Sequence, residues 1–79
     1  MIVARAKRLS RQDGYWRVTV RSGRRFLTLT LWAGEAEPSL EYLGEVLLQE
    51  VHANPKGRIA TRLRRFLGSE VYNRWFWGK

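Results

Sequence analysis

The sequence predicts an α+β fold in which a three-stranded antiparallel sheet is followed by two helices and a short C-terminal helical turn, in the order β-β-β-α-α. Three features lead to this prediction. Up to residue 32 the chain alternates polar and apolar side chains with a period of two, and turns containing glycine interrupt the alternation. From residue 39 onward the apolar residues recur at helical spacing. The length of 79 residues fits a single domain, 1–79, with a thin core.

Strands are expected at residues 2–9, 15–21 and 25–32, with turns at 10–14 and at Ser22-Gly23. A two-residue hairpin turn at Ser22-Gly23 brings the apolar residues of the second and third strands together on one face. The expected cross-strand pairs are Trp16 with Leu29, Arg17 with Thr28, Val18 with Leu27, and Thr19 with Phe26.

The other face of this hairpin mixes aromatic, hydroxyl and guanidinium side chains, unlike a plain solvated surface. In the first strand the alternation predicts Ile2, Ala4 and Ala6 on the inner face, and Arg5 and Lys7 on the outer face. The outer face is therefore expected to contain Arg5, Lys7, Tyr15, Arg17, Thr19, Arg21, Phe26, Thr28, Thr30 and Trp32.

The first helix is expected to begin after Ser39 as N-cap and to run to about His52, across the sheet. Its apolar side consists of Leu40, Leu43, Gly44, Leu47 and Val51.

Asn54-Pro55 is typical of the end of one helix and the start of the next, with Asn54 as N-cap and proline in the first turn. Gly68 is expected to end that second helix, and Ser69-Glu70 to cap a last short turn. The apolar stripe of the second helix is Ile59, Leu63, Phe66 and Leu67.

The charge of the chain indicates a polyanionic partner. Fifteen Lys and Arg, twelve of them Arg, stand against seven Asp and Glu, giving a net charge of +8. The bases concentrate in residues 1–25 and 56–79, and the acids in 26–55. Arginine binds phosphate or guanine through two parallel hydrogen bonds and stacks on bases. A thermophilic source or a high-GC genome could enrich arginine without any binding role, and the charge segregation also fits head-to-tail self-association.

Two surfaces are candidate nucleic-acid sites. On the outer face, cations interleaved with aromatic and hydroxyl side chains suit phosphates, base edges and base faces; the alternative is that the C-terminal segment or a second copy covers this face. On the second helix, a basic stripe could follow a phosphate backbone, or its arginines could pair with Glu41 or Glu45. The candidate residues are Arg5, Lys7, Tyr15, Arg17, Thr19, Arg21, Arg24, Arg25, Thr28 and Trp32, and in the basic stripe Arg58, Arg62 and Arg65.

The C-terminal segment, residues 72–77, is unusually aromatic for a chain end. Because termini fray unless they are docked, we interpret it first as part of the core. An anchor for a dimer or a protein partner comes next, and base stacking last.

The residues argue against an enzyme. The chain has one histidine, His52, one aspartate, Asp13, in a turn, and no cysteine. Metal-ligand spacing, paired catalytic carboxylates and glycine-rich phosphate loops are all missing from the sequence, so no cofactor is expected. The sequence has neither a secretory signal core nor an apolar run of about 20 residues. We therefore expect a cytoplasmic protein that forms no membrane contact.

The stretch Asp13-Gly14-Tyr15-Trp16-Arg17-Val18-Thr19-Val20, followed by Gly23-Arg24-Arg25 and a helix, resembles AP2-like three-stranded modules, including the N-terminal arm-binding domains of phage-type integrases. The resemblance covers residues 13–53 and leaves out the basic second helix and the aromatic segment. It implies a sheet that lies in the DNA major groove. Its contact residues would be Arg17, Thr19, Arg21, Thr28 and Trp32.

These observations together predict a small DNA-binding protein of architectural or regulatory type, with duplex DNA as its partner and a homodimer as one possible form. Two alternatives stay open: binding of single-stranded DNA or RNA by base stacking, and regulation of an acidic protein.

Overall fold

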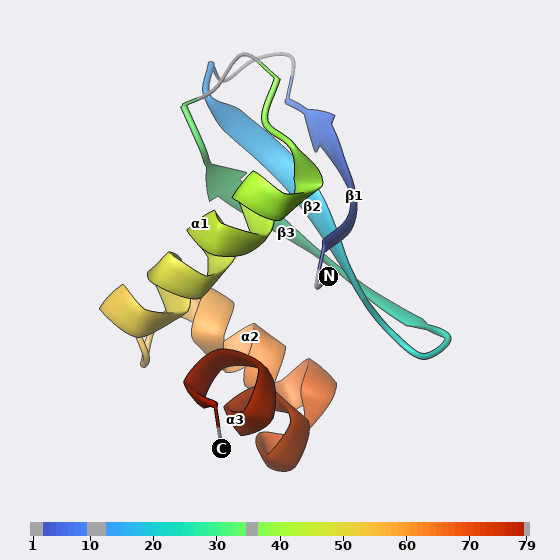
Figure 1. The fold of residues 1–79 in the computed structure, drawn as a ribbon, viewed down its shortest axis with the longest axis vertical. Helices are drawn as coiled ribbons and strands as arrows, with labels where there is room; N and C mark the ends of the chain where they lie inside the picture. Colours follow the sequence, from blue (N-terminus) through green and yellow to red (C-terminus); the bar gives the residue numbers. More distant parts are fainter. Residues whose placement is uncertain (1–2, 10–12, 35–36, 79) are drawn as a thin grey trace. The chain divides into compact units, whose positions relative to one another are not determined.

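The computed structural model describes residues 3–9, 13–34 and 37–78. They form strands β1 (Val3–Arg8), β2 (Tyr15–Ser22) and β3 (Arg25–Trp32), then helices α1 (Leu40–Ala53), α2 (Arg58–Leu67) and α3 (Ser69–Trp77) (Figure 1). The predicted α+β class and the order of the elements are confirmed. The expected C-terminal turn is a helix of nine residues. The chain divides into two compact units, Met1–Leu47 and Leu48–Lys79, and α1 contributes to both.

The sheet of the first unit is antiparallel with strand order β1-β2-β3. Its second turn consists of Gly23 and Arg24, because Ser22 pairs with Arg25. The predicted turn at Ser22-Gly23 was one residue too early. Gly23 has φ +62°, and a two-residue turn with a positive φ at its first position selects glycine there.

The corrected turn changes the partners between β2 and β3 but not the faces. Val18 pairs with Leu29 and not with Leu27 as expected, and Arg17 pairs with Thr30. Trp16 likewise pairs with Leu31, and Thr19 with Thr28. Each partner moves by two residues, and a strand repeats its facing every two residues, so the inner and outer faces keep their predicted members.

In β1 the pairing is interrupted by a bulge between Val3 and Arg5. Val3 takes the inner position opposite Val20 and is buried, whereas Ala4 is exposed. The prediction of Ala4 on the inner face was therefore wrong, because an extra residue in one strand breaks strict alternation. Beyond the bulge, Arg5 and Lys7 lie on the outer face as predicted; Ile2 lies outside the described residues.

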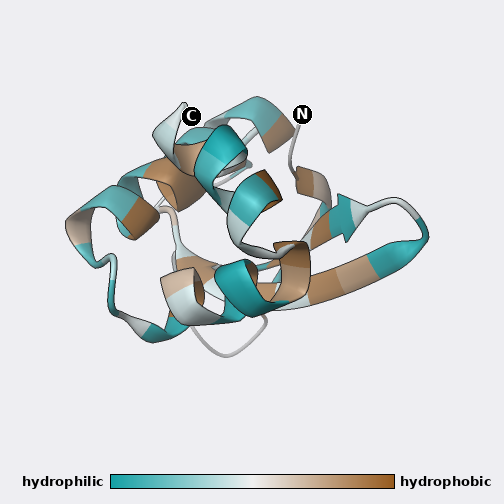
Figure 2. Cartoon of the chain, turned by 90° about the horizontal axis from the view of Figure 1, so that it is seen from below, coloured by the Kyte–Doolittle hydropathy of each residue, from teal (hydrophilic) through white to brown (hydrophobic). Residues whose placement is uncertain are grey.

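The inner face of the sheet holds the core of the first unit. Val18, Val20, Leu29 and Leu31 are buried there, and Leu43 and Leu47 of α1 are fully buried in the same unit. The predicted cap of α1 is confirmed, because the backbone N–H of Tyr42 donates to Ser39 Oγ over 3.0 Å. Alternating apolar and polar residues along the helical ribbons in Figure 2 are typical of helices with one buried side.

In the second unit, α2 begins three residues later than Asn54-Pro55 predicts. The backbone N–H of Asn54 donates to the carbonyl of Glu50, and its side-chain Nδ2 donates to Glu50 Oε2. Asn54 therefore extends α1 and does not cap α2. A turn closed by a 2.9 Å hydrogen bond from Gly57 N–H to the Asn54 carbonyl follows, and Gly57 is the N-cap of α2.

The second unit is built around apolar side chains of its helices. Gly68 ends α2 as predicted, and it also occupies the N-cap of α3, where Ser69 was expected. Tyr72 and Phe76 of α3 are buried, and their rings lie 5.4 Å apart. The C-terminal segment thus supplies core residues, in agreement with its first interpretation. The other buried apolar residues of this unit are Val51, Ala60, Leu63 and Phe66.

The end of α3 is attached to the last turns of α1 within the same unit. His52 Nε2 and the carbonyl oxygen of Phe76 form a hydrogen bond. The indole of Trp77 lies against the imidazole of His52, with ring centroids 4.4 Å apart. These two contacts hold the last turn of α3 against α1 within this unit.

Candidate nucleic-acid interface

The register of the sheet gathers four cationic residues on the outer face: Arg5, Lys7, Arg17 and Arg21. All four are exposed. Among the described residues, no acidic side chain belongs to any strand. Charges of both signs normally intermix on a surface that serves only solubility. A face carrying one sign of charge favours an anionic ligand.

One cross-strand pair on this face joins two like charges. Lys7 of β1 stands directly opposite Arg17 of β2. Residues directly opposite in an antiparallel sheet have Cβ atoms about 4.5 to 5.5 Å apart, and like charges placed there destabilise the sheet. Strand pairing therefore gives no reason for this arrangement, whereas a phosphate lying between the two cations would remove the repulsion.

Hydroxyl and aromatic side chains complete the outer face. Thr28 and Thr30 of β3 are exposed and offer hydrogen bonds to phosphate or base edges. Three aromatic rings are also exposed to solvent: Tyr15 by 38%, Phe26 by 56% and Trp32 by 61%. Tyr15 and Trp32 pair directly across the two strands, and neighbouring exposed rings of this kind are typical of contact surfaces.

Thr19 is the exception among the predicted contact residues. Its side chain is only 7% exposed, because it lies on the central strand between Arg5 and Thr28. A hydroxyl buried there reaches a ligand poorly, so the exposed threonines of β3 are better placed. Thr30, absent from the predicted set of contact residues, belongs to this surface by its exposure and by its pairing with Arg17.

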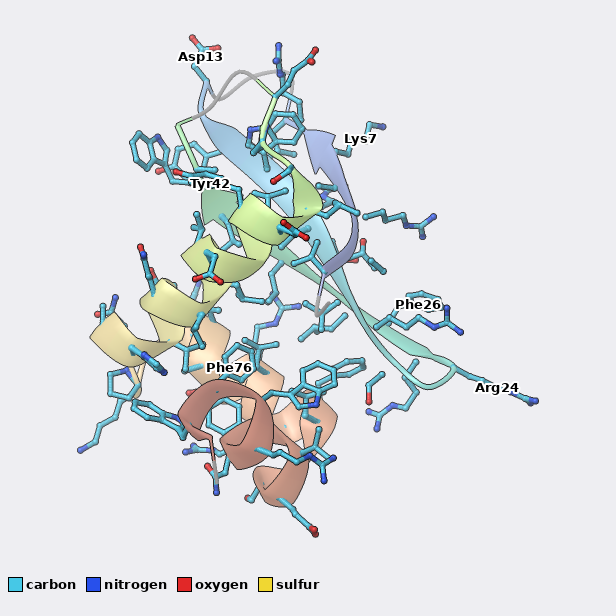
Figure 3. All side chains as sticks on the ribbon, in the orientation of Figure 1. Lys7, Asp13, Arg24, Phe26, Tyr42 and Phe76 are labelled. Carbon is cyan, nitrogen blue, oxygen red and sulfur yellow. The ribbon has the colours of Figure 1, made fainter. Side chains whose placement is uncertain are left out.

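The turn end of the hairpin carries a second group of arginines and extends past β1 (Figure 1). Arg21 Nε donates to the carbonyl of Gly23 over 2.9 Å, which holds its guanidinium beside the turn. Figure 3 shows Arg24 at the tip of the hairpin, pointing away from the sheet. Arg25 pairs with Ser22 and so belongs to the inner face, unlike Arg21 and Phe26.

The position of Trp32 depends on two glycines that the sequence analysis did not connect with it. A Cβ atom on Gly14 would stand 2.7 Å from Trp32 Nε1, and one on Gly34 would stand 2.9 Å from Trp32 Cη2. The indole thus lies against bare backbone at both positions. Both glycines have a positive φ, +83° and +69°, which other residues rarely adopt. The sequence signal for such a contact is one glycine just before the first strand of the hairpin and another just after Trp32 in the second strand, because both positions lie at the open end of the hairpin.

The basic stripe lies on α2 in the second unit. Arg58, Arg62 and Arg65 are all exposed, and their spacing of i, i+4 and i+7 places them on one side of the helix. The opposite side contributes Ala60, Leu63 and Phe66 to the core. The stripe is therefore available to solvent, as predicted.

Within the part of the chain that the structure describes, no cluster of three or more His, Asp or Glu residues is placed to hold a metal ion. None of the helices formed by the described residues combines the length and apolar character needed to cross a bilayer.

Comparison with known proteins gives no match: no protein-family model, no curated protein and no solved structure shows significant similarity to this chain.

Proposed function

We propose that this protein binds duplex DNA through the outer face of its sheet, in an architectural or regulatory role and without catalysing a reaction. The observation that carries the proposal is the row Lys7–Arg17 within a face whose described residues include four cations and no acid. Such a row is unfavourable in the isolated protein and favourable against phosphates. The net charge of +8 supports the same type of partner.

Contacts on the outer face fall into two kinds. Arg5, Lys7 and Arg17 lie close together in adjacent rows of the sheet and would neutralise phosphates, which sets affinity and its dependence on salt. Arg21 and Arg24 lie toward the narrow tip of the hairpin, and a two-stranded ribbon fits the major groove. We assign sequence preference to that end of the hairpin.

The test is a set of titrations with duplex DNA, single-stranded DNA and RNA of equal length, each at two salt concentrations. We expect the tightest binding to duplex DNA, with a dissociation constant in the micromolar range or below at low salt that weakens steeply as salt rises. If none of the three nucleic acids binds, the proposal fails, and an acidic protein becomes the partner to seek.

Replacing the basic stripe of α2 tests whether this helix also contributes to DNA affinity. We expect Arg58, Arg62 and Arg65 changed together to Gln to weaken binding to a preferred duplex and to a scrambled duplex by the same factor, because phosphate contacts carry no sequence information. The slope of log affinity against log salt should fall by about 2.7, at 0.9 for each lost contact. Unequal losses on the two duplexes would show that the stripe reads sequence.

A further inference from the structure

We propose that one end of the outer face binds an unpaired nucleobase, so that the preferred ligand is a duplex that carries an unpaired nucleotide at its end. The stacking site consists of Tyr15 and Trp32, which pair directly across β2 and β3. The inference rests on the proposed function and names the kind of DNA that the same face would select.

Trp32 has the properties of a prearranged stacking surface. Its indole lies against the backbone of Gly14 and Gly34, yet 61% of the side chain remains exposed. The N–H groups of Ala33 and Gly34 both donate to the carbonyl of Gly14, over 2.7 and 3.2 Å, and so tie the two glycines together. A ring held in place loses little conformational entropy when a ligand stacks on it.

The surroundings of the stacking site favour a base over a phosphate. Tyr15, next to Gly14, is a second exposed ring in the same row as Trp32. Asp13, also exposed, precedes Gly14 and repels phosphate at this end of the hairpin (Figure 3). In a duplex the faces of the bases are stacked on one another, and only their edges show in the grooves. Only an unpaired base, or the last base of a duplex, presents a face to a ring.

The other residues of the outer face favour binding of base-paired DNA. Between Trp32 and Phe26 on β3 the outer positions are Thr30 and Thr28, which have hydroxyls and no rings. A single strand bound throughout would use rings at successive bases. The eight residues of β2 span roughly 23 Å, which is about seven base-pair steps. The cations along this length suit a duplex, and the stacking site lies at one end of it.

The experiment uses the full chain and three DNA ligands: a short blunt duplex, the same duplex with one overhanging 2-aminopurine nucleotide, and the same duplex with an abasic overhang of equal charge. Overhangs on the 3′ and 5′ strands are tested separately. We expect at least one 2-aminopurine overhang to bind roughly tenfold more tightly than its abasic counterpart, the size of one base stacked on an aromatic ring, and its fluorescence to be quenched.

Variants with matched controls show which residues cause the preference for the 2-aminopurine overhang. Trp32→Leu should remove the tenfold preference, so that the 2-aminopurine and abasic overhangs bind with equal affinity. Trp77→Leu makes the same substitution at another exposed tryptophan, 41% exposed in the second unit, and should keep the preference. Gly34→Ala should lose it, because the new methyl group meets the indole. Gly23→Ala, also at a positive φ but with open space around its Cβ, should keep it.

Equal affinity for the 2-aminopurine and abasic overhangs in the wild type, or a preference that survives Trp32→Leu, would overturn the inference while the proposed duplex binding stands. Tighter binding of a single strand of equal length than of either overhang would overturn it too. Loss of binding to all three ligands contradicts the proposed function itself.

Discussion

Changing Arg5, Lys7 and Arg17 together to Gln is expected to abolish most DNA binding and to leave the fold as stable as before or more stable. At 50 mM salt the loss should be on the order of a thousandfold, and the salt slope should fall by about 2.7, if each residue contacts one phosphate. Stability should not fall, because the substitution removes the like-charge pair Lys7–Arg17 from the sheet. Glutamine keeps part of the aliphatic stem, so packing along the strands is largely preserved.

Measuring both DNA affinity and stability distinguishes a loss of DNA contacts from a loss of the fold. The control is the variant with Arg58, Arg62 and Arg65 changed to Gln, which loses the same net charge of three from α2 in the other unit. Affinity is measured by fluorescence anisotropy at several salt concentrations, and stability by urea unfolding. A sheet variant that binds DNA with wild-type affinity would show that the outer face does not contribute to binding. A marked loss of stability would show that the three cations serve the fold.

Deleting residues 75–79 is expected to lower the free energy of unfolding by about 3 to 5 kcal/mol, the usual cost of removing a buried phenylalanine. Phe76 is 2% exposed, and its carbonyl accepts the hydrogen bond from His52. The deletion also removes Trp77 from the imidazole of His52. Small domains unfold with about 5 to 15 kcal/mol, so this loss is a large fraction of the total and should lower the melting temperature by many degrees.

A single substitution and a control define the cause of that loss. Phe76→Ala should reproduce most of the destabilisation, whereas Trp77→Leu, at a partly exposed position, should cost much less. Thermal and urea unfolding followed by circular dichroism measure all three variants. If the truncated chain melts unchanged but no longer self-associates or binds a partner protein, residues 75–79 form an interface and not a core.

Local patterns in the sequence were enough to predict the α+β class, the three strands, the cap of α1 at Ser39 and the two faces of the hairpin. These follow from local rules: alternation with period two, helical spacing and the chemistry of capping. The predicted division of residues between the two faces was correct even though the turn was wrongly placed at Ser22-Gly23. The true turn displaced every partner by two residues, and the faces of a strand repeat with that period.

The pairings and contacts that make up the candidate site depend on how the strands pack together and could not be predicted from the sequence. Whether Lys7 meets Arg17 depends on the register of β1, and the bulge before Arg5 has no signature in the alternation. The sequence predicts Thr19 as a surface residue, but its neighbours on β1 and β3 cover it. The contact of Trp32 with Gly14 joins residues far apart in the chain. Such contacts arise from the packing of side chains across strands, a long-range property that no local pattern of residues specifies.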